Sequence, residues 1–230
     1  MSETILLRME GICKAFGSNP VLTGINLDVH AGEAVALLGE NGAGKSTLIK
    51  ILGGIHRADA GKIYIGGEEK SIPSVAEAAR NGIQIIHQEI VLVPHRTISE
   101  NVFLGREPRT GLGLVDQQKM RRETQKLIDD FGLKLNPDTL IKDLSIGMQQ
   151  LVEIIKAIGA NARIVVMDEP TSSLSESEVQ TLFGMIRMLK ERKVGIIYIS
   201  HRLEELFAIT DHVLVMRDGK AVGTVAAKDA

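Results

Sequence analysis

Nine consecutive residues in the first quarter of the chain, GENGAGKST, have the types and the order that bind phosphate groups. They fit the pattern G-x-x-x-x-G-K-[ST] and lie between an apolar run typical of a strand (AVALL) and one typical of a helix (TLIKILGG). Glycines let backbone N–H groups surround phosphate oxygens, and the helix N-terminus adds its partial positive charge. The alternative is a glycine-rich turn that fits by chance, but the flanking strand and helix favour a phosphate site. The predicted phosphate-binding residues are Gly39, Glu40, Asn41, Gly42, Ala43, Gly44, Lys45, Ser46 and Thr47.

Four side chains would carry the chemistry of a bound triphosphate. Lys45 is expected to reach the β- and γ-phosphates, and the hydroxyl of Ser46 is expected to ligate Mg²⁺. The apolar strand in RIVVMDEP ends in Asp168, which can hold Mg²⁺ beside the phosphates, and in Glu169, which is placed to act as general base on an attacking water. Alone, this pattern also fits a strand that ends in a solvated acidic turn. The phosphate-binding segment in the same chain favours the metal site.

Two further polar residues follow apolar strands. Gln88 ends GIQIIHQ, and His201 comes directly after VGIIYIS. Because the carboxyl ends of parallel strands meet at the crevice where ligands bind, Gln88 is a candidate to contact Mg²⁺ or the attacking water, and His201 to contact the γ-phosphate. Each residue by itself also fits an ordinary strand end. The remaining histidines, at positions 30, 56, 87, 95 and 212, are predicted to be structural or surface groups.

The elements that must position these residues alternate between strand and helix over most of the chain. Strands are predicted at 5–12, 21–30, 33–39, 82–88, 162–169, 194–200 and 211–219, with a short pair of strands around 61–67. Helices are predicted after Gly44, at 74–81, 116–132, 145–159 and 176–191, and after His201. The alternation implies an α/β fold with a parallel sheet covered by helices, preceded by antiparallel strands. The two consecutive helices between 116 and 160 imply a helical insertion.

The composition fits a globular cytoplasmic domain. The chain has 230 residues, of which 44% are hydrophobic and 24% charged, and its formal net charge is −2. The single cysteine, Cys13, excludes an internal disulfide and favours a reducing compartment. Neither a secretory signal nor an apolar run long enough to span a bilayer is present in the sequence.

Together and in this order, the motifs resemble the nucleotide-binding domain of ABC transporters over essentially the whole chain. The matching pieces are GENGAGKST, HQ at 87–88, LSIGMQQ at 144–150, VVMDEP, SSLS at 172–175 and SH at 200–201. The resemblance implies ATP and Mg²⁺ as ligands and ATP hydrolysis as the activity. It also implies a P-loop NTPase (RecA-like) core with an N-terminal antiparallel β subdomain, over residues 1–93 and 161–230, and an inserted α-helical subdomain over 94–160.

The resemblance assigns LSIGMQQ to a contact between two ABC domains. In that family the segment begins a helix that meets the γ-phosphate of ATP held by the opposite subunit, so Ser145 and the N–H of Gly147 are expected to make this contact. Ser145 also fits an ordinary N-cap, and one hydroxyl can serve in both ways. Met148 stands where the family pattern has glutamine, which removes one amide contact.

A second departure lies in SSLS, where Ser175 replaces the aspartate of the family's usual SALD. Ser175 and Glu178 instead form an S-x-x-E pattern, which predicts a capping box for the helix at 176–191. ATP hydrolysis is still expected, because the lysine, the two acids and the histidine of the family are all present.

One aromatic residue is predicted to bind the base. The family stacks an aromatic ring upstream of the phosphate loop on adenine, and Phe16 in CKAFGS lies at a fitting place. The chain has only two Tyr, five Phe and no Trp, so few other rings are available. The alternative is that Phe16 packs in the core.

Three longer stretches indicate a branch of the family: residues 87–107, LSIGMQQLVEIIKAI and DEPTSSLSESEV. They resemble the first half of the tandem ATPase subunits of monosaccharide (ribose, galactose or xylose) importers, so we expect either an N-terminal fragment or a single-domain subunit. The expected partners are an integral-membrane permease, a second ABC domain (a homodimer or a tandem second half) and, indirectly, a periplasmic or extracellular sugar-binding protein. The expected location is the inner face of the plasma membrane.

Two other functions fit the same nucleotide motifs. One is a non-transport ABC ATPase acting on ribosomes or DNA, and the mildly acidic charge and the lack of a basic arm or an aromatic-basic patch in the sequence oppose it, so no nucleic-acid partner is expected. The other is a nucleotide switch without turnover, which the pair of acids at 168–169 opposes.

Overall fold

The predicted parallel sheet forms the centre of the computed structural model, which describes residues 4–229. Its strands, in spatial order, are β10 (Lys220–Ala226), β9 (His212–Arg217), β3 (Ala34–Leu38), β8 (Gly195–Ile199), β7 (Ile164–Asp168) and β6 (Ile83–Ile86). All pairs are parallel except β10 with β9. The carboxyl ends of five strands therefore meet at one edge, as the alternation of strand and helix predicted.

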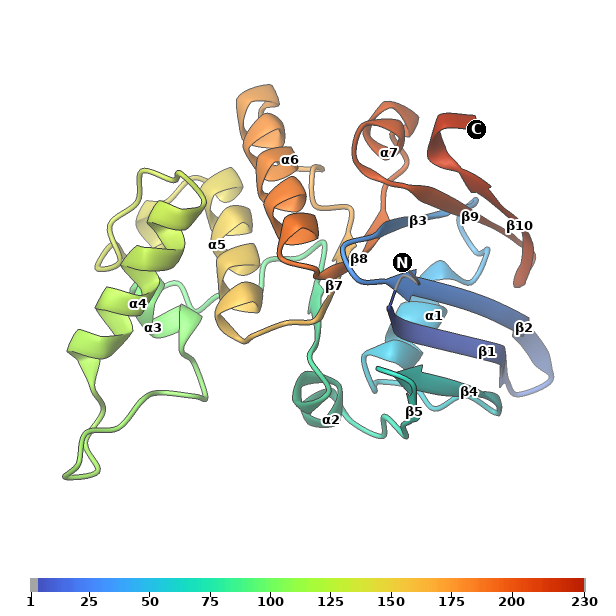
Figure 1. Ribbon diagram of the computed structural model, residues 1–230, viewed down its shortest axis with the longest axis horizontal. Helices are drawn as coiled ribbons and strands as arrows, with labels where there is room; N and C mark the ends of the chain where they lie inside the picture. The colour runs from blue at the N-terminus through green and yellow to red at the C-terminus, as the bar shows by residue number, and fades with distance from the viewer. Residues whose placement is uncertain (1–3, 230) are drawn as a thin grey trace.

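Both faces of the five parallel strands are largely buried, and their residues alternate between two hydrophobic clusters, whereas the edge strand β10 is mostly exposed. In β3, Val35 and Leu37 face one cluster, whereas Ala34 and Ala36 face the other. The first face packs on α1 (Lys45–Leu52), which lies between the two sheets of the molecule (Figure 1). The helices on the second face are α5 (Ile146–Gly159), α6 (Glu176–Glu191) and α7 (Leu203–Ile209).

A second, antiparallel sheet covers α1 from the other side. Its strands are β2 (Asn19–His30), β1 (Ile5–Phe16), β4 (Ala60–Ile65) and the short β5 (Glu68–Glu69). The β1–β2 pair carries a fork of hydrogen bonds from the Arg8 guanidinium to both carboxylate oxygens of Asp28, at 3.0 and 2.9 Å. This sheet is the predicted antiparallel region at the start of the chain, and β1 runs four residues beyond the predicted end.

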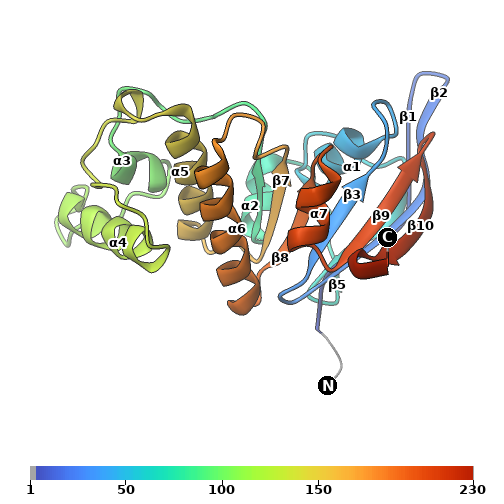
Figure 2. The same ribbon diagram turned by 90° about the horizontal axis from the view of Figure 1, so that it is seen from above.

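The helical insertion lies at the opposite end of the molecule from β10 (Figures 1 and 2). It contains α3 (Ile98–Val102), α4 (Gln117–Asp130), a 3-10 turn (Ile141–Asp143) and α5. The sequence analysis named α4 and α5 but missed α3, which is only five residues long. Thr97 and Glu100 cap α3 reciprocally, at 3.2 and 2.9 Å. The predicted boundaries between the core and the helical subdomain, after residues 93 and 160, stay predictions. Residues 1–3 and 230 of the predicted core lie outside the residues that the structure describes.

The remaining elements are short. They are α2 (Val75–Arg80), which begins at the cap Ser74, and a last 3-10 turn (Ala227–Asp229). None of the helices within residues 4–229 has both the length and the apolar composition that crossing a membrane demands.

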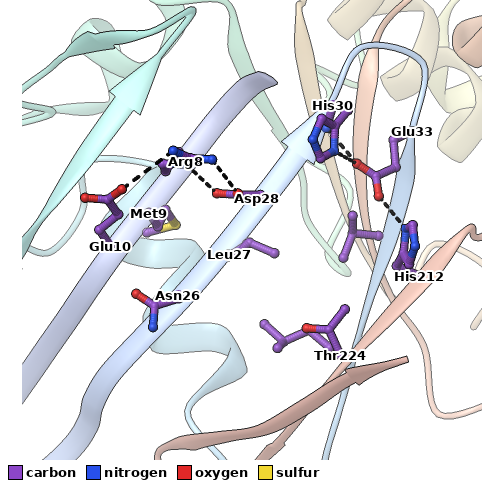
Figure 3. Close-up of a pocket in the computed structure, with 12 residues that line it drawn as sticks. Arg8, Met9, Glu10, Asn26, Leu27, Asp28, His30, Glu33, His212 and Thr224 are labelled. Carbon is purple, nitrogen blue, oxygen red and sulfur yellow. Dashed lines mark hydrogen bonds and ion pairs between the residues drawn. The ribbon is translucent and has the colours of Figure 1, made fainter. Parts of the chain in front are cut away.

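A single carboxylate, Glu33, joins the two sheets where β2, β3 and β9 meet. One of its oxygens lies 2.6 Å from Nδ1 of His30 and accepts the His30 N–H at 2.7 Å, and the other lies 2.6 Å from Nδ1 of His212. Figure 3 shows these three side chains beside a cavity of about 450 Å³ between the sheets. The histidines at 30 and 212 are thus structural, as predicted.

Replacing Glu33 by alanine is expected to lower the free energy of unfolding by about 2–3 kcal/mol, because hydrogen bonds to a charged group contribute about 1.5–3 kcal/mol. Urea denaturation measures the change. Glu10→Ala is the matched control, since Glu10 lines the same cavity but only forms a 3.8 Å ion pair with Arg8 at the surface. Equal losses in the two variants would show that Glu33 does not join the sheets.

Candidate functional site

The loop between β3 and α1, residues 39–44, has a backbone shape that depends on glycine, as Gly44 and Gly39 show. Gly44, the N-cap of α1, has a φ of 99°, and a Cβ there would lie 2.5 Å from Cδ2 of Leu22. A Cβ on Gly39 would lie 2.3 Å from the carbonyl oxygen of Met216. The loop therefore passes close against β2 and β9 and presents the start of α1 outward. The first amides of a helix have no acceptor within the helix, so they are free to bind an anion.

Lys45 lies across this loop. Its Nζ donates to the carbonyl oxygens of Gly39, at 2.6 Å, and Glu40, at 3.1 Å, and the residue is only 9% exposed. These bonds hold the ammonium group above the glycine-rich turn, where it can meet phosphate oxygens. Gly39 and Glu40 thus support the lysine through their carbonyl groups, and their predicted contact with phosphate stays a prediction.

Four loops that follow parallel strands meet around one cavity of about 310 Å³. The loop after β3 supplies the phosphate-binding segment, and β6, β7 and β8 supply the polar residues predicted at their ends. The lining residues are Val21, Asn41, Gly42, Ala43, Gly44, Lys45, Ser46, Thr47, Gln88, Asp168, Glu169, Ile199 and His201. The structure therefore brings together all of the predicted catalytic and metal-binding side chains.

Asp168, at the end of β7, lies in surroundings that disfavour its ionised form. Burial raises the pKa of Asp168 above its ordinary value of 3.8, and the neighbouring charge of Glu169 raises it further, against smaller opposing effects of His87, Lys45 and His201. Both causes disfavour the ionised carboxylate. The ionised form of Asp168 therefore needs a positive charge close by.

Glu169 has an unusual backbone that aims its side chain at His201. Its φ is 49°, in the left-handed region that non-glycine residues rarely adopt, and its N–H donates to the carbonyl oxygen of Ile199 at 2.9 Å. One carboxylate oxygen lies 2.6 Å from Nε2 of His201. Such strain persists only where the surroundings fix it, and it is concentrated at functional sites.

Gln88 is exposed and lies two residues past the end of β6. The chain that follows it is fastened to α5 at Val91. The Val91 N–H donates to the Glu153 carboxylate at 3.0 Å, and its carbonyl oxygen accepts from Nζ of Lys156 at 3.0 Å. Desolvation raises the pKa of Glu153, and the contacts with Lys156 and Val91 oppose this effect. The position of the segment that contains Gln88 is therefore set by α5.

Ser145 and Gly147 do not line the cavity of their own chain but lie at the start of α5. Ser145 is the N-cap, with its Oγ accepting the Met148 N–H at 3.2 Å and donating to Glu178 at 3.3 Å. The same carboxylate accepts from the N–H of Ser175 at 2.9 Å, which is one half of the predicted capping box, and from the Ser175 hydroxyl at 2.7 Å. These Ser175 bonds are the main causes that lower the pKa of Glu178.

Glu178 also lies against Gly147, where a Cβ would come within 2.3 Å of its carboxylate. It thereby links the start of α5 to the loop that follows the two acids, a connection that the capping pattern alone did not indicate.

Phe16 lies outside the residues that line the cavity. Its ring is 46% exposed, packs edge-on against His56 with centroids 5.1 Å apart, and has Nζ of Lys14 5.5 Å from its centroid. The alternative of a core phenylalanine is therefore wrong, and adenine stacking stays a prediction.

Sequence reasoning missed two lining residues, Val21 and Ile199. Both are apolar and belong to strands, so no residue type marked them. Ile199 could have been found from its place as the last residue of the buried strand β8, two residues before His201, whereas Val21 reaches the site only through the packing of β2 on the glycine-rich loop.

Comparison with known proteins agrees with this geometry. The family described as ABC transporter matches residues 22–172. The galactose/methyl galactoside import ATP-binding protein of Clostridium tetani is 48% identical over 227 residues, which is 97% of this chain and 45% of that protein. The ribose import ATP-binding protein 1 of Rubrobacter xylanophilus is 49% identical over 222 residues, which is 96% of this chain and 44% of that protein. The chain thus spans about half the length of these relatives.

Solved structures agree as well. The ADP conformation of an ATP-binding cassette of an ABC transporter superposes with a TM-score of 0.86 at 27% identity, over 98% of this chain and 92% of that one. A nucleotide-free ATP-binding cassette from an ABC transporter gives a TM-score of 0.85 at 27% identity, over 96% and 91%. The chain has the predicted fold, and the family match covers more than half of the chain. The chain therefore belongs to the ABC transporter family.

Proposed function

We propose that this chain binds and hydrolyses ATP, and that hydrolysis powers the import of a monosaccharide through a separate membrane permease. The observation that carries the proposal is the convergence of Lys45, Asp168, Glu169 and His201 on the cavity beside the glycine-rich loop. The names of the similar proteins, import ATP-binding proteins for ribose and galactose, support the transport part.

The residues of the cavity fit a Mg²⁺ ion beside the phosphates. Ser46, Gln88 and Asp168 offer a hydroxyl, an amide and a carboxylate oxygen, which are the hard ligands that Mg²⁺ prefers. A divalent cation would also offset the burial and the like charge that raise the pKa of Asp168. When bound, Mg²⁺ would neutralise charge on the phosphate oxygens.

The chain's own side chains divide the remaining work. Lys45 and the first amides of α1 hold the β- and γ-phosphates, and Glu169 accepts a proton from the attacking water as general base. His201, 2.6 Å from Glu169, orients that carboxylate and contacts the γ-phosphate. Gln88 contacts Mg²⁺ or the attacking water, and Phe16 stacks on adenine.

The sealed form of the site requires a second ABC domain, from a homodimer or a tandem half. Two such domains close face to face, and each nucleotide lies between the glycine-rich loop of one and the α5 start of the other. Ser145 is exposed there, whereas Gly147 is buried against the Glu178 carboxylate, so a phosphate that meets this helix N-terminus would displace that side chain. Hydrolysis removes the γ-phosphate bridge and lets the domains separate.

The link to the permease passes through the segment after Gln88. Val91 and Val93 are 60% and 38% exposed, and the backbone of Val91 is fastened to α5 by Glu153 and Lys156. A permease segment seated on these valines would therefore move with the helix that meets the γ-phosphate. The chain would act at the cytoplasmic face of the inner membrane, as a peripheral subunit, with a sugar-binding protein acting on the other side.

Purification from native membranes tests this function. The full-length native protein is expected to be recovered with an integral-membrane permease, and its ATPase rate in vesicles is expected to rise when the sugar-loaded binding protein is added. Recovery with ribosomes or DNA instead, and a rate that ignores the binding protein, would contradict the import proposal.

Glu169→Gln is expected to lower ATP turnover by roughly 10²–10⁴-fold, the usual contribution of a general base. Because the amide retains the size of the side chain and leaves Lys45 intact, the affinity for ATP should change little. Turnover is measured by phosphate release, and affinity by equilibrium binding of a fluorescent ATP analogue.

Lys45→Ala is the contrasting variant, since it is expected to lose triphosphate binding itself. Full turnover in the Glu169 variant would remove that residue from its role as base. Tight triphosphate binding without Lys45 would contradict the proposed phosphate site.

Asp168→Asn is expected to stabilise the nucleotide-free protein at neutral pH while weakening Mg²⁺-dependent ATP binding. Since the pKa of Asp168 is raised on folding, the folded state binds more protons between pH 3.8 and the raised value, so stability falls as pH rises through that window. Asparagine cannot ionise, so the variant does not lose this stability as the pH rises. Thermal unfolding from pH 4 to pH 8 measures it, and a variant that is less stable than the parent at pH 7 would refute the assignment.

A further inference from the structure

A buried carboxylate lies directly behind the site, on α7, and takes no part in the chemistry described above. Glu205 is 6% exposed. One oxygen accepts from three hydroxyls, Oγ1 of Thr171 at 2.8 Å, OH of Tyr198 at 3.0 Å and Oγ of Ser200 at 3.0 Å, and the other accepts from Nη1 of Arg202 at 2.9 Å.

Two of these donors belong to the loops that carry the catalytic pair. Thr171 is two residues after Glu169, and Ser200 directly precedes His201. Both are buried, at 5% and 4% exposure, so their hydroxyls have no free access to solvent. Glu205 therefore joins the end of β7 to the end of β8 from behind the site.

Both carboxylate oxygens of Glu205 accept hydrogen bonds, so this hydrogen-bond network is rigid. A buried carboxylate is costly unless it is fully hydrogen-bonded, and Glu205 has four donors. Burial, followed by the charge of Glu205, raises the pKa of Tyr198 well above its usual range, so this phenol stays protonated and remains a donor. Arg202 approaches from the solvent side, with its side chain 66% exposed. The three hydroxyl contacts are the ones that are shielded from water.

We propose that Glu205 is a positioning residue that sets the 2.6 Å contact between Glu169 and His201 by holding Thr171 and Ser200 on one carboxylate oxygen. This inference rests on the proposed ATP hydrolysis by that pair. The physical reason is that catalytic geometry tolerates little displacement, since a shift of about 1 Å can cost roughly 100-fold in rate. Glu169, with its left-handed backbone, also needs outside contacts to hold it.

The test is Glu205→Gln in the full-length native protein. Glutamine keeps the size, but its neutral amide oxygen is a weaker acceptor, and placing that oxygen on the three hydroxyls turns the NH2 donor toward the Arg202 guanidinium, so the Arg202 side of the network is lost and the hydroxyl bonds weaken. ATP turnover (kcat) is expected to fall roughly 10- to 100-fold. KM and the affinity for a fluorescent ATP analogue should change by less than about twofold, because the phosphate loop is untouched. Glu204→Gln, at the exposed neighbouring position of α7, is the matched control and should retain the parent rate.

A second pair of variants decides the matter if Glu205→Gln fails to fold. Thr171→Val removes only the hydroxyl at constant shape and should lower kcat, whereas Thr171→Ser retains the donor and should restore most of the turnover. Equal rates in the valine and serine variants would overturn the proposal.

A double-mutant cycle with His201→Ala measures whether the kcat losses of the two substitutions are coupled. A purely structural role of Glu205 would give no such coupling. If Glu205 acts through the catalytic pair, its substitution should add little further loss of kcat once His201 is gone. Additive losses, or a kcat loss matched by an equal loss of nucleotide affinity, would overturn the inference. A normal rate in Glu205→Gln with turnover still lost in Glu169→Gln would refute this inference alone, whereas full turnover in Glu169→Gln would refute the proposed function.

Discussion

The parallel pairing of β3, β8, β7 and β6 is the constraint on which the rest of the site depends. In the parallel sheet each of these strands ends at the same edge, so residues 39–47, 88, 168–169 and 201, which are far apart in sequence, surround one cavity. The register of the strands also brings the pair together, since Asp168 pairs with Ile199, Glu169 follows Asp168 directly, and His201 lies two residues after Ile199. A shift of one residue between β7 and β8 would turn one of the two side chains away from the other.

Electrostatics explains why this edge suits a nucleotide bound with a cation. Two adjacent acids at the end of a buried strand raise the free energy of the nucleotide-free fold, and the raised pKa of Asp168 expresses that cost. Opposite them, the start of α1 and the ammonium group of Lys45 favour negative charge. A phosphate chain with its metal ion satisfies both halves together, whereas a free anion or a free cation would satisfy only one.

The sequence predicted those parts of the fold and site that are specified locally. The glycine-rich loop, the acids at the end of β7 and the cap of α6 depend on neighbouring residues, and the patterns of apolar and turn residues indicated the sheet and the helices α4 and α5. Helix α3 was missed because five residues give no periodicity, although Thr97 and Glu100 held the capping signal in the sequence. Glu33 and Glu205 could not be predicted, because their partners come from other elements and no local pattern distinguishes them from surface acids.

Four glutamates have the same structural role: the carboxylate of each one joins segments that are separate in the chain. Glu33 joins the two sheets, Glu153 fastens the segment after β6 to α5, Glu178 links α5 to the loop after β7, and Glu205 joins that loop to the end of β8. A carboxylate has about four acceptor positions, so it can bind several donors at once. Glu153 and Glu205 are buried, and because an unsatisfied buried charge is so unfavourable, these two junctions resist gradual loosening. Glu153 and Glu178 therefore connect the segments after β6 and β7 to α5 of the helical insertion, and Glu205 connects the segment after β7 to the end of β8.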